Sequence, residues 1–141
     1  MENFTETATL PGVSPDKAFA YISDVTNMHE WIEAVVKNDA ESEPRAGQEF
    51  DSLSSFMGLK LRGTQQVLAY TPSSHFAWGA EKPFHSRFDV TLQPAGNDTK
   101  LTIEAEMETK GIPGGAIVVR RSTKKAIAGM AANLKKNLSN S

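Results

Sequence analysis

The sequence predicts an α+β fold in which one antiparallel sheet of seven strands curves around a long helix at the end of the chain. Two observations predict this class. Apolar and polar residues alternate along seven separate stretches, which is the period of a half-buried strand. The residues after position 111 instead place apolar side chains three and four positions apart, which is the period of a helix.

Length and composition fit one domain over residues 1–141. The chain is 39% hydrophobic and 23% charged, which are globular proportions, and its formal net charge of −2 argues against a nucleic-acid partner. It has no cysteine, which excludes disulfides and thiolate metal sites. We recognise no signal peptide and no apolar run of membrane-spanning length, so we expect a cytoplasmic protein without a membrane span.

The first strand and two short helices are predicted from local signals. Residues 3–10 alternate and are rich in threonine, which favours a strand. Ser14 is placed to cap a first short helix, which begins with a proline. Asp24 or Thr26 can cap a second one, which ends near Trp31.

Six further strands are predicted between residues 34 and 110. Short turns separate them, so strands that follow one another in the chain are expected to pair antiparallel. Their clean alternation predicts a sheet that is covered on one face and exposed to water on the other. The predicted strands are Val35–Ala40, Glu49–Met57, Leu59–Ala69, Phe76–Ala80, Phe84–Leu92 and Thr99–Thr109.

The last helix is expected to cover the apolar face of this sheet. Its apolar stripe runs from Ile112 to Leu138 in steps of three and four residues, and its basic residues lie mostly off the stripe. A helix on a membrane surface would have a similar pattern. The covering role is favoured because the sheet needs a cover and the chain offers no other long helix.

Several segments occur in a recognisable order along the chain. They are Val13–Ile22, Trp31, Ala46–Phe50, Val67–Pro72 followed by Phe76–Trp78, and Phe88–Leu92 followed by Asp98–Thr102. With these segments, the chain resembles the helix-grip fold of the START/Bet v 1-like (SRPBCC) superfamily, especially its polyketide cyclase/dehydrase-like branch. The resemblance covers nearly the whole chain.

The resemblance implies a curved sheet that grips the last helix and encloses a cavity. Members of the superfamily bind lipids, sterols, polyketides, plant hormones or quinone-like molecules there, and some cyclise or dehydrate polyketides. The expected function is therefore the binding of a small hydrophobic molecule of the lipid, polyketide or aromatic type, without a cofactor. The alternative is a polyketide cyclase/dehydratase-like enzyme that uses acid–base groups in the same cavity. The oligomeric state stays open, and a homodimer is one option.

Residues with inward positions on the strands and on the last helix are expected to form the cavity wall. Four of them are polar (Ser52, Ser54, Gln65 and Ser86), which is unusual for a plain core because buried polar groups need partners. A β-bulge would turn them outward, and the apolar members could simply fill a core. The predicted ligand-binding residues are Phe50, Ser54, Phe56, Gln65, Trp78, Ser86, Phe88, Met107, Ile127 and Met130.

Catalytic and metal sites have little support in the sequence. Glu6 is the one carboxylate with an inward position, and burial would suit it to proton transfer, although a glutamate exposed at a strand edge is the simpler interpretation. The histidines (His29, His75 and His85) form no metal-binding motif, so no metal site is predicted. We assign Trp31 to packing.

Two charged surfaces are also predicted. Residues 85–89 should lie beside residues 104–108 on the outer face of the sheet, as a solvated surface of paired charges. The basic side of the last helix carries Lys124 and Lys125. A partner-binding module that uses this side is the third functional hypothesis.

Overall fold

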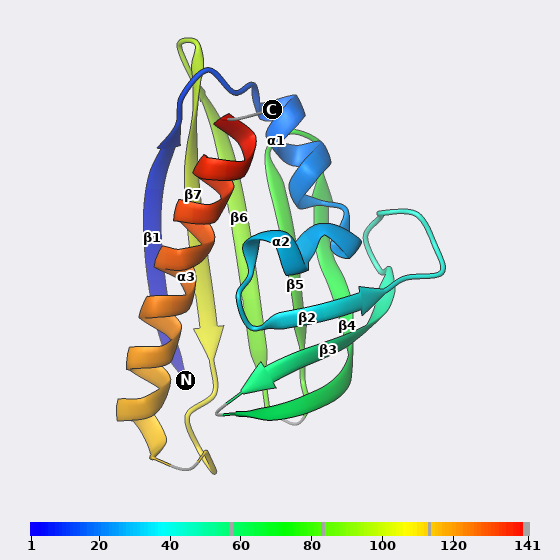
Figure 1. Ribbon diagram of the computed structural model, residues 1–141, viewed down its shortest axis with the longest axis vertical. Helices are drawn as coiled ribbons and strands as arrows, with labels where there is room; N and C mark the ends of the chain where they lie inside the picture. Colours follow the sequence, from blue (N-terminus) through cyan, green and yellow to red (C-terminus); the bar gives the residue numbers. More distant parts are fainter. Residues whose placement is uncertain (57, 83, 113, 140–141) are drawn as a thin grey trace.

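The computed structural model describes residues 1–56, 58–82, 84–112 and 114–139. One antiparallel sheet curves around a long helix, and short helices close one end of it (Figure 1). This is the predicted α+β helix-grip fold. Its elements are β1 (Glu2–Leu10), α1 (Pro15–Ile22), the 3-10 segment η1 (Val25–Asn27), α2 (Met28–Trp31), β2 (Val35–Asp39), β3 (Glu49–Phe56), β4 (Leu59–Thr71), β5 (His75–Ala80), β6 (Ser86–Ala95), β7 (Asp98–Met107) and α3 (Gly115–Ser139).

The strand order is β1-β7-β6-β5-β4-β3-β2, so β1 and β2 are the two edges of the sheet. Most predicted bounds hold within two residues; the exception is β6, whose predicted end is Leu92 and which continues to Ala95 in its pairing with β7. β7 ends at Met107 rather than at Thr109, because its two neighbouring strands extend no farther. The terminal residues of β1 and β6 on this side, Glu2 and Ser86, both pair with Met107. Met57, the predicted end of the third strand, lies outside the described residues.

Predicted capping side chains are present at α1 and at η1, the 3-10 segment that leads into α2, whereas α2 itself has no side-chain cap. The Ser14 hydroxyl accepts a hydrogen bond from the Lys17 backbone N–H at 3.2 Å, which satisfies a free donor in the first turn of α1. Of the two candidates for the next cap, Asp24 holds that position, since its carboxylate accepts the Thr26 backbone N–H at 3.0 Å. The two segments therefore begin where the sequence predicts.

The predicted stripe of α3 is its buried face. α3 packs on β1 and β7, and the other end of the sheet lies under α1 and α2 (Figure 1). Among the described helices, none is both long enough and apolar enough to cross a bilayer. The buried residues of the stripe are Val119, Thr123, Ile127, Met130, Ala131, Leu134 and Leu138.

Polar side chains attach α3 to the short helices near its C-terminal end. The Asn133 side chain donates to the Trp31 carbonyl at 3.3 Å, and the Asn137 side chain donates to the Glu30 carbonyl and to the Tyr21 hydroxyl, both at 3.1 Å. The Tyr21 hydroxyl donates to the Glu30 carboxylate at 2.8 Å. Burial, together with this hydrogen bond to an anion, raises the pKa of Tyr21 to about 12, so the phenol stays protonated as a donor.

A chain of aromatic rings crosses the inner face of the sheet, which we define as the face toward α3. Phe19 from α1 contacts Phe76 with ring centroids 6.3 Å apart, and Phe76 contacts Trp78 at 5.7 Å. Trp78 meets Trp31 edge-on at 5.7 Å and stacks on Phe88 at 5.2 Å. Because Trp31 is fully buried, its predicted packing role is confirmed.

The backbones of β5 and β6 approach closely at Gly79, and this contact generates a test of the fold. A Cβ atom on Gly79 would lie 2.2 Å from the Ser86 carbonyl oxygen, which is too close for any carbon. We expect Gly79→Ala to lower the free energy of unfolding by about 1–3 kcal/mol or more, as overpacking does. Urea denaturation measures the change.

Gly63 on β4 is the matched control for this prediction, because a Cβ atom there would meet nothing within 4 Å. Gly63→Ala should leave the free energy of unfolding unchanged or slightly higher. Equal stability of the two variants would show that the close contact at Gly79 does not constrain the sheet.

Candidate functional site

A cavity of about 550 Å³ lies between the inner face of the sheet and one flank of α3. This volume is within the range of small-molecule binding sites in proteins. β3, β4, β5, β6, the end of β7 and α3 supply its walls, and the turn from α2 into β2 borders it. The apolar lining residues that are buried or half-buried are Ile32, Val35, Leu61, Trp78, Ala80, Phe84, Phe88, Met107, Ile112, Val119, Ala126 and Met130.

Seven of the ten residues predicted to bind a ligand line this one cavity: Ser54, Gln65, Trp78, Ser86, Phe88, Met107 and Met130. Phe50 and Ile127 do not line it and are buried in the hydrophobic core. The core and the cavity share the inner face of the sheet, so an inward position alone does not separate them. The side chain of Phe56 lies outside the described part of the structure.

The four inward polar residues all line the cavity. β3 and β4 pair without a shift, with Ser52 opposite Gly63 and Ser54 opposite Leu61. The bulge that would have turned Gln65 outward lies farther along β4, between Val67 and Ala69. The register predicted for these side chains is therefore the observed one.

None of these four side chains forms a hydrogen bond with any described residue, and Ser52 is the extreme case. It is 4% exposed, and its hydroxyl is buried without a partner. A buried hydroxyl that lacks a partner costs about 1–3 kcal/mol. The wall thus offers donors and acceptors that the protein itself leaves unused.

Carboxylates are scarce around the cavity. Glu6 is half-buried on the inner face of the edge strand β1, but no residue of β1 lines the cavity. Among the described lining residues the one carboxylate is Glu33, which is exposed beside β2. The part of the wall that is buried or half-buried contains no described ionisable residue.

The lining residues that the sequence analysis did not predict include two that have no side chain. Gly63 on β4 and Gly129 on α3 both line the cavity, and a Cβ atom at either would meet nothing within 4 Å. Gly129 had a signal in the sequence, since a glycine in a helix interior costs about 1 kcal/mol relative to alanine. Both glycines leave space that side chains would otherwise fill.

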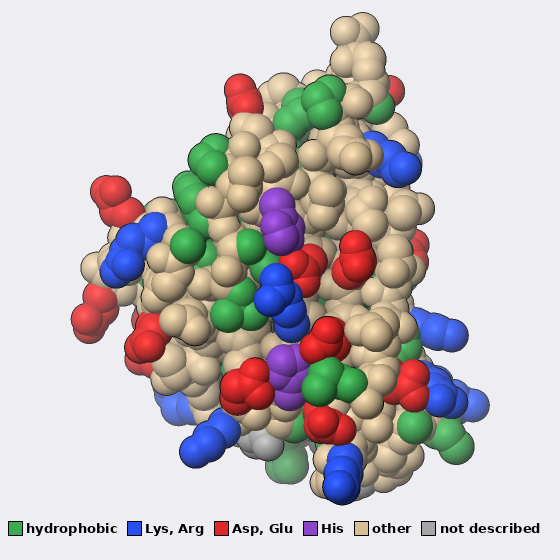
Figure 2. All heavy atoms as spheres, turned by 180° about the vertical axis from the view of Figure 1, so that it is seen from behind, with side chains coloured by type: hydrophobic (Ala, Val, Ile, Leu, Met, Phe, Trp, Pro, Cys, Tyr) green, Lys and Arg blue, Asp and Glu red, His purple; other side chains and the backbone are tan. Residues whose placement is uncertain are grey.

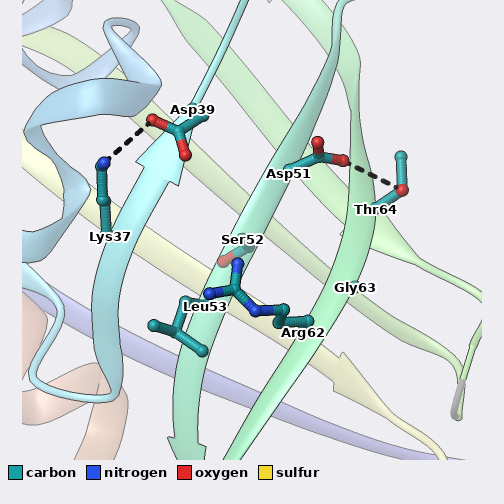
Figure 3. Close-up of a pocket in the computed structure, with 8 residues that line it drawn as sticks. All are labelled: Lys37, Asp39, Asp51, Ser52, Leu53, Arg62, Gly63 and Thr64. Carbon is teal, nitrogen blue, oxygen red and sulfur yellow. Dashed lines mark hydrogen bonds and ion pairs between the residues drawn. The ribbon is translucent and has the colours of Figure 1, made fainter.

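A second hollow, of about 370 Å³, is a polar groove on the outer side of β2, β3 and β4 (Figure 3). The Lys37 ammonium lies 3.5 Å from the Asp39 carboxylate, and the Thr64 hydroxyl donates to the Asp51 carboxylate at 3.2 Å. This ion pair and this hydrogen bond lie on exposed residues, which is typical of a solvated surface. We therefore take the inner cavity as the candidate site.

The outer face of the sheet carries the predicted charged surface (Figure 2). Asp89 accepts hydrogen bonds from Arg87 at 2.9 and 3.1 Å, and His75 Nε2 lies 2.7 Å from it. Burial alone would raise the pKa of Asp89, but the hydrogen bonds from Arg87 and His75 outweigh it and hold that pKa below its usual value. The described residues contain no group of three or more potential ligands arranged for a metal ion.

Comparisons with known proteins agree with this architecture. The family model described as polyketide cyclase / dehydrase and lipid transport matches residues 1–139. A START superfamily protein from Mycobacterium smegmatis superposes with a TM-score of 0.83 at 12% identity, over 98% of this chain and 97% of the other. The Zhui aromatase/cyclase from a Streptomyces species gives a TM-score of 0.83 at 10% identity, over 97% and 93%. Such identities show a shared fold alone. No curated protein matches the sequence.

The unpartnered Ser52 hydroxyl generates a stability prediction. Ser52→Ala removes a buried polar group that has no partner, so we expect the free energy of unfolding to stay level or to rise by up to about 1 kcal/mol. Thr99→Val is the matched control, because the buried Thr99 hydroxyl donates to the Val13 carbonyl at 2.6 Å. That variant should lose about 1–3 kcal/mol. Urea denaturation of both variants measures these changes. A clear loss of stability for Ser52→Ala would mean that the Ser52 hydroxyl forms a hydrogen bond in the native protein.

His85 generates a prediction about pH. Its ring nitrogens lie 2.7 Å from the Glu81 carboxylate and 2.8 Å from the Glu106 carboxylate, and these hydrogen bonds raise the pKa of His85 above its usual value. Its stabilising contribution is therefore complete below the unfolded-state pKa of about 6.5 and is lost as the pH rises through the higher folded-state pKa. His85→Gln should cost most stability on the acid side of this window and progressively less above it.

Denaturation of the wild type and the His85→Gln variant between about pH 5 and pH 9 measures this difference. His29→Gln is the control, because His29 is about half exposed and its Nε2 lies 4.0 Å from the Glu30 carboxylate. Comparison of the two variants isolates the effect of the carboxylates of Glu81 and Glu106 on His85. A His85→Gln profile parallel to that of the wild type would contradict the assignment.

Proposed function

Because the chain belongs to the polyketide cyclase/dehydrase and lipid transport family, we propose that it binds a small hydrophobic molecule of the lipid, polyketide or aromatic type in the cavity between its sheet and α3. One observation carries this proposal: the cavity is lined by apolar side chains and by a few polar groups that form no hydrogen bond with the described residues. Binding sites for small molecules have this composition, in which burial supplies affinity and a few polar groups supply orientation.

The aromatic wall is suited to hold the body of such a ligand. Trp78 is stacked on Phe88 and is supported from behind by the edge-on contact with Trp31, so its ring is fixed before a ligand arrives. A fixed ring loses little conformational entropy on binding. Each Å² of apolar surface that the ligand buries contributes about 25 cal/mol to the gross affinity. Ser54, Gln65 and Ser86 are the residues proposed to orient the polar groups of the ligand.

Binding is favoured over acid–base catalysis as the function of this cavity. General acid–base catalysis needs an ionisable side chain within hydrogen-bond reach of the reacting group. Glu6, the residue considered for that role, is not part of the cavity lining, and Glu33 is exposed. The likeness to an aromatase/cyclase is a likeness of fold and assigns no residue here to that reaction.

Gly129 offers a direct test of binding in the cavity. Gly129→Leu would place a side chain in the open space beside α3, while removing a glycine from a helix interior. We expect it to weaken the binding of N-phenylnaphthylamine, a neutral aromatic fluorescent probe, by about tenfold or more, because each 1.4 kcal/mol of lost burial is a factor of ten. The free energy of unfolding should stay level or rise by up to about 1 kcal/mol.

Gly129→Ala is the control for this experiment, since it makes the same change in helix propensity and adds only one methyl group. It should bind the probe nearly as the wild type does. Fluorescence titration gives the affinities and thermal unfolding gives the stabilities. Unchanged binding by Gly129→Leu would place the ligand elsewhere, and the absence of any binding by the wild type would count against the proposed function.

A further inference from the structure

Charge is distributed unevenly along the chain. α3 carries six basic residues and no acidic residue, whereas the rest of the chain has nine basic and seventeen acidic residues. Of the six, only Arg120 forms an ion pair within the described residues, with the Glu2 carboxylate at 2.7 Å. No acidic residue occupies the first turn of α3, so the positive end of the helix dipole is not neutralised there. A strongly positive helix therefore lies along the cavity of a protein whose net charge is negative.

The charges around the cavity lie on exposed residues, which define its mouth. Two cations whose side chains form no ion pair with any described residue lie there, Lys125 on α3 and Lys82 in the turn after β5. Glu33 is the one carboxylate among the described residues of the mouth. Arg62 also borders the cavity, but its side chain lies in the outer groove beside Leu53 (Figure 3). The deeper wall holds hydroxyls and one amide without any described charge.

This separation decides which ends of a ligand can be charged. A charge inside the neutral part of the cavity would lose its hydration without gaining an opposite charge, which is costly. A negative group at the mouth would keep partial hydration and meet two ammonium groups that are not engaged in other ion pairs. A positive group at the mouth would be repelled by both lysines and by the field of α3.

We infer that the cavity takes an amphipathic anion: the apolar body lies between the sheet and α3, and its carboxylate, sulfonate or phosphate lies at the mouth between Lys82 and Lys125. This inference rests on the proposed function and narrows it to a ligand class. The lysines hold the acid group, and the aromatic wall around Trp78 holds the body. The sign of the charge at the mouth selects against neutral and cationic molecules of the same shape.

Two probes with the same aromatic body separate these contributions. Anilinonaphthalene sulfonate carries a sulfonate, and N-phenylnaphthylamine lacks it. Fluorescence titration of the intact chain should show tighter binding of the sulfonate. The double variant Lys82→Glu/Lys125→Glu should weaken binding of the sulfonate by about tenfold or more, and binding of the neutral probe by no more than about twofold.

Lys135→Glu is the matched control. It reverses the same kind of charge on an exposed position of α3, ten residues beyond Lys125 and therefore about 15 Å farther along the helix. It should change the affinity for either probe by no more than about twofold at physiological ionic strength, because the Debye length there is about 8 Å.

The outcomes distinguish the two proposals. Equal affinities for both probes, or a charge reversal that weakens both alike, would overturn the anionic ligand and leave the binding function intact. A loss with Lys135→Glu as large as with the double variant would mean that affinity depends on the overall positive charge of α3 rather than on a defined site, and would also overturn the inference. If neither probe binds to the wild type, both the ligand class and the proposed function fall.

Discussion

The inner face of the sheet is wider than one helix can cover, and most features of this protein follow from that constraint. α3 packs on β1 and β7, α1 packs on β5 and β6, and α2 packs on β2. Between these contacts, a part of the inner face that includes Trp78 and Phe88 borders a cavity of about 550 Å³. Apolar side chains that line an open cavity lack packing partners on one side, which costs stability.

The same flank of α3 changes its role along its length. Near the C-terminal end, Asn133 and Asn137 bond to the short helices and close the sheet. One and two turns earlier, the flank presents Gly129 and Ala126 and lines the cavity instead. Large side chains at these two positions would fill the cavity, and longer polar ones would bridge it. The small residues therefore leave space for the cavity, whereas the asparagines farther along α3 bond it to the short helices.

The fold could be predicted from the sequence because each strand and helix shows its own period of apolar residues within its local sequence. The stripe of α3 and the alternation of β6 and β7 needed no knowledge of the rest. The cavity could be predicted only in part. The predicted inward positions placed Ser54 and Ser86 on the inner face of the sheet, where the cavity lies. The same criterion also selected Phe50 and Ile127, which face inward but belong to the core. Inward position could not identify Gly129 as a lining residue, because it contributes to the cavity by having no side chain.

Buried polar groups without a described partner occur both away from the cavity, at Trp31 Nε1, Asn38 Oδ1 and Gln48 Oε1, and in the cavity wall, at Ser52. On the outer face, Asp89 meets both Arg87 and His75, and each charge there stabilises its neighbour. In the cavity, the hydroxyl of Ser52 has no partner, and Lys125 at the mouth forms no ion pair with any described residue. A molecule bound in the cavity would reach Ser52 and supply the partner that its hydroxyl lacks, whereas Trp31, Asn38 and Gln48 do not line the cavity.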